Sequence, residues 1–178
     1  MKRIPARELA FMALCVAIGL VSKRIVSPVT NLLTDLISIP GGSAAVGFTL
    51  AFLIIGKLMV SFPAAATAMG FVQALLAMAF GMAGNQGAFA LVSYTLPGAV
   101  IDLAALTMKK RGLAYCVTAD VLASAASALL SALVIMQVKL AGVPLLLWML
   151  MAAASGVAGG VIAHFVASRV KKAIHNEQ

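Results

Sequence analysis

Six apolar runs alternate with polar breaks along the chain. They cover residues 8–22, 44–58, 64–82, 88–108, 113–138 and 145–168. A helix needs roughly 20 apolar residues to cross a bilayer, so the first run is short unless the helix continues to Val26. The pattern predicts a single domain over residues 1–178, an all-α integral membrane protein built as a six-helix transmembrane bundle.

Composition supports this class. Of the residues, 63% are hydrophobic and 10% charged, and the mean hydropathy of +1.09 is far above that of a soluble domain. The net charge of +8 would suit nucleic acid on a soluble module, but here the bases lie between apolar runs, so we expect no nucleic-acid partner. Cys15 and Cys116 lie in different runs, which indicates buried thiols and no metal pair. The chain lacks the GxxxxGK[ST] pattern of a P-loop.

The bases also predict an orientation. Short loops rich in Lys and Arg stay in the cytoplasm, and Lys109, Lys110 and Arg111 mark one such loop. With both termini in the cytoplasm, ten of the 13 bases fall inside. These ten are Lys2, Arg3, Arg7, Lys57, Lys109, Lys110, Arg111, Arg169, Lys171 and Lys172. Turn-forming residues over 23–43 then predict a long first extracellular loop, and the polar break at 84–87 faces outward.

Small residues form stripes on several predicted helices. In the first run Ala6, Ala10, Ala13 and Ala17 fall on one helix face. Such stripes let another helix pack closely, either within the same chain or in a partner, and the residues alone favour the first. The last run carries a similar stripe and the Gly156-x3-Gly160 pair, which predicts tight packing inside the bundle.

Two acidic residues are predicted at membrane depth. Asp102 and Asp120 lie in the inner halves of adjacent helices, where an unpaired carboxylate is costly. We expect them to pair with Lys57 or with the bases at 109–111, and a proton relay is the alternative. His164 is expected to be a packed polar residue. No nucleophile, base and orienting group occur together, so no enzyme is predicted.

The whole chain resembles the S components of energy-coupling factor transporters, which are bacterial vitamin importers. The resemblance covers the number of helices, the basic N-terminus, the long first loop and the Ala13-Leu14-Cys15-Val16-Ala17 segment, which matches the family's Ala-x3-Ala motif. Residues 62–103 look like the family's third and fourth helices. The resemblance implies that Ala13 and Ala17 dock a T component. No substrate signature is decisive, although residues 84–85 are loosely similar to the thiamine-precursor subgroup.

The resemblance also implies a vitamin site at the outer ends of the later helices, under the first loop. Polar and aromatic side chains there could bond to or stack on a heterocycle. The candidates are Asn31, Asp35, Asn85, Gln86, Ser93, Tyr94, Gln137 and Trp148. Alternatives stay open, because Trp148 suits an interfacial anchor and Asn85 and Gln86 suit helix caps. Lys23 and Arg24 either attract an anionic vitamin or, as the residues favour, extend to lipid phosphates.

The expected function is therefore that of a substrate-specificity subunit in the bacterial plasma membrane. It would bind a small vitamin or vitamin precursor and deliver it through a T component and two ATPase subunits, without a cofactor of its own. One alternative is a self-sufficient proton-coupled carrier that works through Asp102 and Asp120. Another is a membrane assembly protein with no ligand.

Overall fold

The computed structural model describes residues 5–35, 42–82, 84–108, 110–131 and 143–176. Every regular element within these ranges is helical. The helices are α1 (Ala6–Asp35), α2 (Gly42–Met59), α3 (Ala65–Ala79), the 3₁₀ segment η1 (Gly84–Phe89), α4 (Ala90–Thr107), α5 (Leu113–Leu130) and α6 (Val143–Asn176). The predicted all-α fold is thus confirmed.

Four of these helices are long and apolar enough to cross a membrane. The four segments are Ala6–Pro28, Gly87–Thr107, Leu113–Leu130 and Leu145–Ala173, while the apolar parts of α2 and α3 are shorter. Large apolar side chains also cover the outside of the bundle, as at Ile25, Leu106 and Phe165, which are 65%, 73% and 62% exposed. Apolar surface on this scale suits contact with hydrocarbon, so the fold is compatible with a membrane protein.

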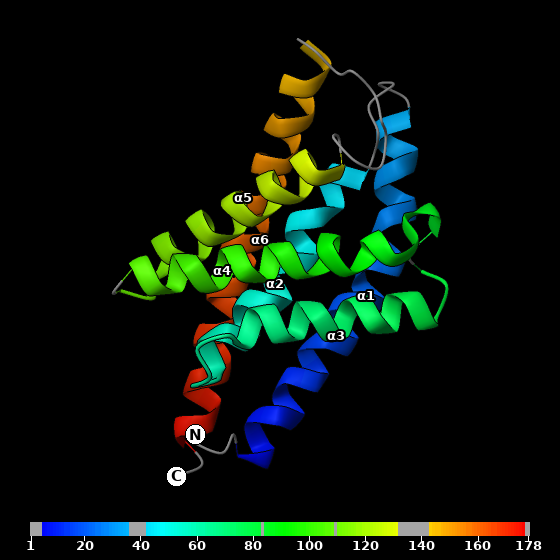
Figure 1. Ribbon diagram of the computed structural model, residues 1–178. Helices are drawn as coiled ribbons and strands as arrows, with labels where there is room; N and C mark the ends of the chain where they lie inside the picture. The colour runs from blue at the N-terminus through cyan, green and yellow to red at the C-terminus, as the bar shows by residue number, and fades with distance from the viewer. Residues whose placement is uncertain (1–4, 36–41, 83, 109, 132–142, 177–178) are drawn as a thin grey trace.

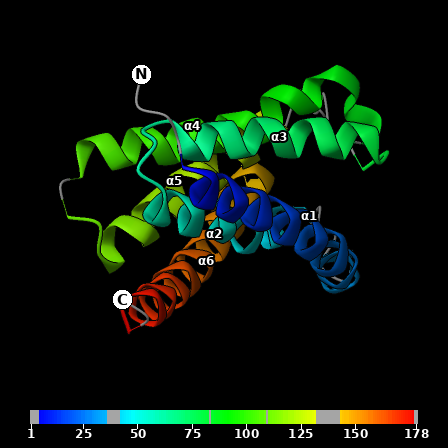
Figure 2. The ribbon, with the colours of Figure 1, turned by 90° about the horizontal axis from the view of Figure 1, so that it is seen from below.

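The helices pack in two groups. Figures 1 and 2 show α3 and α4 side by side as a layer that crosses the steeper α1, α2 and α6. Helix α6 packs mainly against α2 and α5. In Figure 1 the first turns of α1 and the last turns of α6 lie at the same, lower end of the molecule, and α3 and α4 meet at the right-hand edge.

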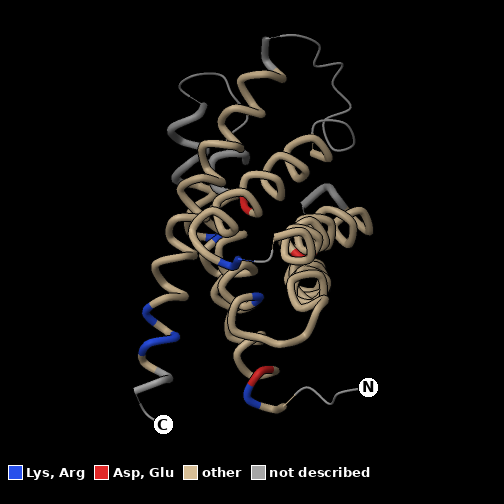
Figure 3. Tube along the Cα trace, turned by 90° about the vertical axis from the view of Figure 1, so that its left-hand side faces the viewer, with Lys and Arg blue, Asp and Glu red and all other residues tan. Residues whose placement is uncertain are grey.

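Charge gathers at the end shared by the two chain termini. Figure 3 shows basic residues on the first turn of α1 and the last turns of α6, where the sequence places Arg7, Arg169, Lys171 and Lys172. Glu8 accepts hydrogen bonds from the Ser61 hydroxyl (2.7 Å) and the Ser61 amide (3.1 Å), which ties α1 to the segment between α2 and α3.

Glycines allow the helices to approach closely at their crossings. A Cβ at Gly159 would overlap the backbone of Gly47 in α2, and one at Gly160 would lie 2.6 Å from the Cα of Val117 in α5. At the crossing of α3 and α4, a Cβ at Gly98 would lie 2.7 Å from the carbonyl carbon of Ala66. The tight packing predicted for the last helix is confirmed, since Ala163 is fully buried and Ala167 is 3% exposed.

Helix α1 corrects the predicted first loop. The turn-forming residues from Lys23 onward suggested an extended loop to residue 43, yet the helix continues to Asp35 with Pro28 inside it. A proline removes only one backbone donor, which a long apolar helix tolerates. Helix α4 likewise continues through Pro97, where a kink or break was expected. Residues 36–41, between α1 and α2, lie outside the described part.

Candidate functional site

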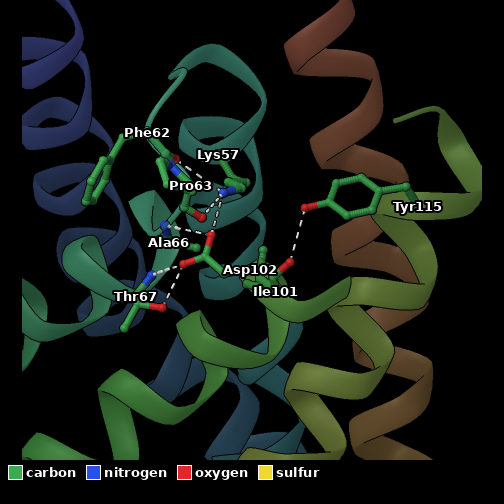
Figure 4. Close-up of polar contacts among 8 residues, drawn as sticks. All are labelled: Lys57, Phe62, Pro63, Ala66, Thr67, Ile101, Asp102 and Tyr115. Atoms are coloured by element: carbon green, nitrogen blue, oxygen red, sulfur yellow. Dashed lines mark hydrogen bonds and ion pairs between the residues drawn. The ribbon is translucent and has the colours of Figure 1, made fainter. Parts of the chain in front are cut away.

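A buried ion pair joins α2 to α4. The Lys57 ammonium lies 2.8 Å from a carboxylate oxygen of Asp102, and both side chains are buried (Figure 4). This confirms the predicted partner of Asp102. Because burying two charges is costly, the pair needs further hydrogen bonds to be stable.

Helix ends supply those hydrogen bonds. Asp102 accepts from the backbone amides of Ala66 (3.3 Å) and Thr67 (2.8 Å) and from the Thr67 hydroxyl (2.7 Å). Helix α3 has no capping side chain of its own at Ala64, so Asp102 caps it from α4. Lys57 donates to the carbonyls of Phe62 and Pro63 just after α2 (Figure 4). The cluster therefore serves to fix three elements.

Asp120 lies in a different environment, in the packing of α5 against α6. Its side chain is fully buried, and the Ser124 hydroxyl lies 3.4 Å from Oδ1. Its Oδ2 has no hydrogen-bond partner among the described residues. Asp120 does not pair with Lys57, so the ion pair expected for it is not found in the described part.

A polar cavity lies where five helices converge. Its volume is about 80 Å³. Its polar lining comes from α1, α2, α3 and α4 and from the last turn of α5. These polar residues are Lys23, Ser27, Thr49, Gln73, Ser93, Tyr94, Ser127 and Ser131. Polar groups inside an apolar bundle require partners or a ligand, which makes this cavity the candidate site.

Lys23 and Tyr94 meet at the edge of this cavity. The Lys23 ammonium donates a hydrogen bond of 2.7 Å to the Tyr94 hydroxyl and lies 3.9 Å from the centre of its ring. Lys23 is half-buried, and its ammonium contacts Tyr94 at the cavity. Arg24, the next residue, is exposed.

The predicted site residues separate into three groups. Ser93 and Tyr94 line the cavity. Trp148 is not part of its lining, because it packs in a separate cluster with Ala128 and Ala152 and is 4% exposed. The remaining predictions fall on side chains or residues outside the described part. They are Asn31, Asp35, Asn85, Gln86 and Gln137.

Sequence reasoning missed several lining residues. Gln73 is 6% exposed, and its side-chain nitrogen lies 2.6 Å from where a Cβ at Gly19 would stand. Thr49, Ser127 and Ser131 also escaped notice, because single hydroxyls in apolar helices are common. A polar amide in the middle of the apolar 64–82 run was the one signal that pointed inward.

Comparison with known proteins does not identify a relative of this chain. No family model, curated protein or solved structure matches the chain. Within the described residues no group of three or more metal-ligating side chains occurs.

Proposed function

We propose that this chain is the ligand-binding S component of an energy-coupling factor transporter in a bacterial plasma membrane. It binds a small vitamin or vitamin precursor from outside the cell and performs no chemistry itself. A T component and two ATPase subunits, supplied as separate chains, energise transport.

The observation that carries this proposal is the polar cavity inside an otherwise apolar bundle. Lys23 lies 17 residues after Ala6, which places it about 26 Å along α1 from the end that holds the chain termini. If the termini are cytoplasmic, the cavity opens towards the outer face.

The alanine stripe supports the partner part of the proposal. Ala6, Ala10, Ala13 and Ala17 are all exposed, so no helix of the described chain covers them. A strip of small residues facing outward suits a second protein helix better than lipid alone.

The test is ligand binding by the purified protein, without ATP or partners. A panel of neutral, anionic and cationic vitamins is screened by thermal shift and then by calorimetry. At least one compound should raise the melting temperature of the wild type. Ser127→Leu, which fills the cavity, should abolish this effect, whereas Thr118→Leu, on an exposed position of the same helix, should not. Failure of the whole panel would favour the ligand-free assembly role.

Asp120 favours a second candidate, the proton-coupled carrier. It is a buried carboxyl group with one oxygen unpartnered in the described part of the chain, as intramembrane proton sites often are. Asp102 supports that candidate less, because Lys57 and Thr67 engage both of its oxygens. Uptake that collapses on adding an uncoupler, while cellular ATP is held constant, would favour the carrier.

A further inference from the structure

Lys23 brings a positive charge to the cavity, and no carboxylate among the described side chains pairs with it. The three carboxylates whose side chains the structure describes are engaged elsewhere: Glu8 bonds to Ser61, Asp102 pairs with Lys57, and Asp120 lies beside Ser124. The ring and hydroxyl of Tyr94 compensate the ammonium only in part, since cation–π contacts and neutral acceptors are weaker than an anion.

A second hollow adjoins the cavity at this point. We call it the entrance hollow; it has a volume of about 350 Å³ and is lined by Lys23, Arg24, Ser27, Pro28, Met82 and Tyr94. It shares Lys23, Ser27 and Tyr94 with the inner cavity, so the Lys23–Tyr94 contact lies between the two spaces. The inner cavity, at about 80 Å³, is small beside ligand sites of roughly 300–1,000 Å³. A vitamin-sized ligand therefore cannot be held by the inner cavity alone and must extend into the entrance hollow.

We infer that the ligand is a small organic anion that bridges the two spaces. Its carboxylate or phosphate group accepts hydrogen bonds from the Lys23 ammonium in place of the Tyr94 hydroxyl, with Arg24 beside it in the entrance hollow. Its uncharged polar part lies in the inner cavity among Thr49, Gln73 and Ser127. The inference rests on the proposed function and names the substrate class of the same site.

Two features favour a soluble anion over an anionic lipid headgroup. Lys23 lines a polar cavity, whereas the neighbouring Arg24 is the base exposed at the surface. The apolar groove between α1 and α3 that would hold an acyl chain includes Arg24 but not Lys23 in its lining. A lipid phosphate would thus meet Arg24 first, and Lys23 would keep its bond to Tyr94.

The experiment compares acids with their neutral analogues. Calorimetry in phosphatidylcholine nanodiscs, which contain no anionic lipid, measures nicotinate against nicotinamide, pantothenate against panthenol, and biotin against biotinamide. In at least one pair the acid should bind and the neutral member should bind more weakly. Lys23→Gln should lower affinity for that acid by about 10- to 100-fold and for its neutral analogue by less than about threefold.

Two further variants separate charge at the site from net charge and from misfolding. Lys23→Arg keeps the charge and should retain most of the affinity for the acid. Arg7→Gln removes one charge at the opposite end of α1 and should leave both affinities unchanged. The melting temperature of each variant is measured beside that of the wild type, and affinities are compared only where the melting temperatures agree.

Each remaining outcome decides between the two proposals. The anion inference would be wrong if neutral or cationic compounds bind best, or if Lys23→Gln leaves the affinity for the acid unchanged. Either result would leave the proposed function standing. Stabilisation by phosphatidylglycerol alone, dependent on Lys23 and with no soluble acid bound, would also overturn it. Absence of binding by every compound would remove the proposed function itself.

Discussion

Lys57 and Asp102 form an ion pair in which each side chain also bonds to the backbone at or just before the start of α3. The carboxylate meets the free amides at the start of α3, and the ammonium meets carbonyls that follow α2. Each charge therefore lies where a helix dipole favours its sign. This explains how an ion pair persists in an apolar bundle. It also means that replacing either Lys57 or Asp102 alone should lower the stability of the protein.

We predict that Asp102→Asn lowers stability without changing ligand affinity. Lys57 would remain buried without a counter-charge, which typically costs about 3–5 kcal/mol. The proposed ligand site lies eight residues earlier in α4, at Tyr94, about 12 Å away along the helix axis. Thermal unfolding in detergent and calorimetry measure the two effects.

A double variant provides the control. Lys57→Met with Asp102→Asn removes the unpaired charge, and the new amide oxygen can still accept from Thr67. Stability should therefore recover in part. A double variant less stable than Asp102→Asn alone would show that the charge of Lys57 is not the source of the loss.

Substitution of Asp120 should have the opposite effect on stability from substitution of Asp102. Asp120→Asn keeps the size of the side chain and the contact with Ser124, and it removes the need to bury an ionisable group at the crossing with α6. We predict an unchanged or higher melting temperature and unchanged ATP-dependent uptake. Loss of uptake in a protein of normal stability would support the proton-coupled carrier.

At the scale of single residues, sequence reasoning succeeded where one chemical constraint dominated. An intramembrane carboxylate needs a partner, and Lys57 was among the few bases near Asp102. The cavity was predicted only through Ser93 and Tyr94. Gln73 and Ser127 could not be assigned to it, because which face of each helix points inward depends on how five helices cross.

Helix positions followed the apolar runs closely. The second, third and fourth runs began and ended within three residues of α2, α3 and α4. Helix α1 departed most, since a long apolar helix outweighs the local turn preference of Pro28 and its neighbours. Glycine spacing in the last run predicted close packing but not the partner, which is both α2 and α5.

The helix crossings predict that alanine substitution at two glycines has different effects on stability. Gly159→Ala places a methyl group against the backbone of Gly47 and the carboxylate of Asp120, so α6 must move away from α2. We expect a loss of about 1–3 kcal/mol, as for other overpacked cores. Gly112→Ala is the matched control, because a Cβ there meets nothing within 4 Å and its φ of −98° is allowed for alanine. Chemical denaturation of both variants checks the prediction, and equal stabilities would contradict it.

On the scale of the whole molecule, the two ends of the bundle differ in character. One end carries the described chain termini and a group of bases, while the cavity and Lys23 lie towards the other end of α1. The alanine stripe begins at Ala6, near the basic end, and runs to Ala17 on the exposed side of α1. A partner that docks on this stripe would therefore contact the chain without covering the cavity.

The two interpretations of the stripe predict opposite phenotypes. If Ala13 and Ala17 dock a T component, Ala13→Trp and Ala17→Trp should prevent its close approach, because the added volume separates the backbones along the whole contact. Both positions are exposed in the isolated chain, so melting temperature and ligand affinity should remain near the wild-type values. Co-purification of partner subunits and uptake should be lost.

Val16→Trp is the matched control on the same helix. Val16 is 3% exposed and faces the core, so the larger ring should overpack the bundle by about 1–3 kcal/mol and lower the melting temperature. Lost stability in Ala13→Trp and Ala17→Trp, with an unchanged yield of complex, would show that the stripe packs within the chain and would exclude docking. Normal stability and binding together with lost co-purification would identify the stripe as the partner surface, because steric exclusion at an exposed face acts on the complex and not on the fold.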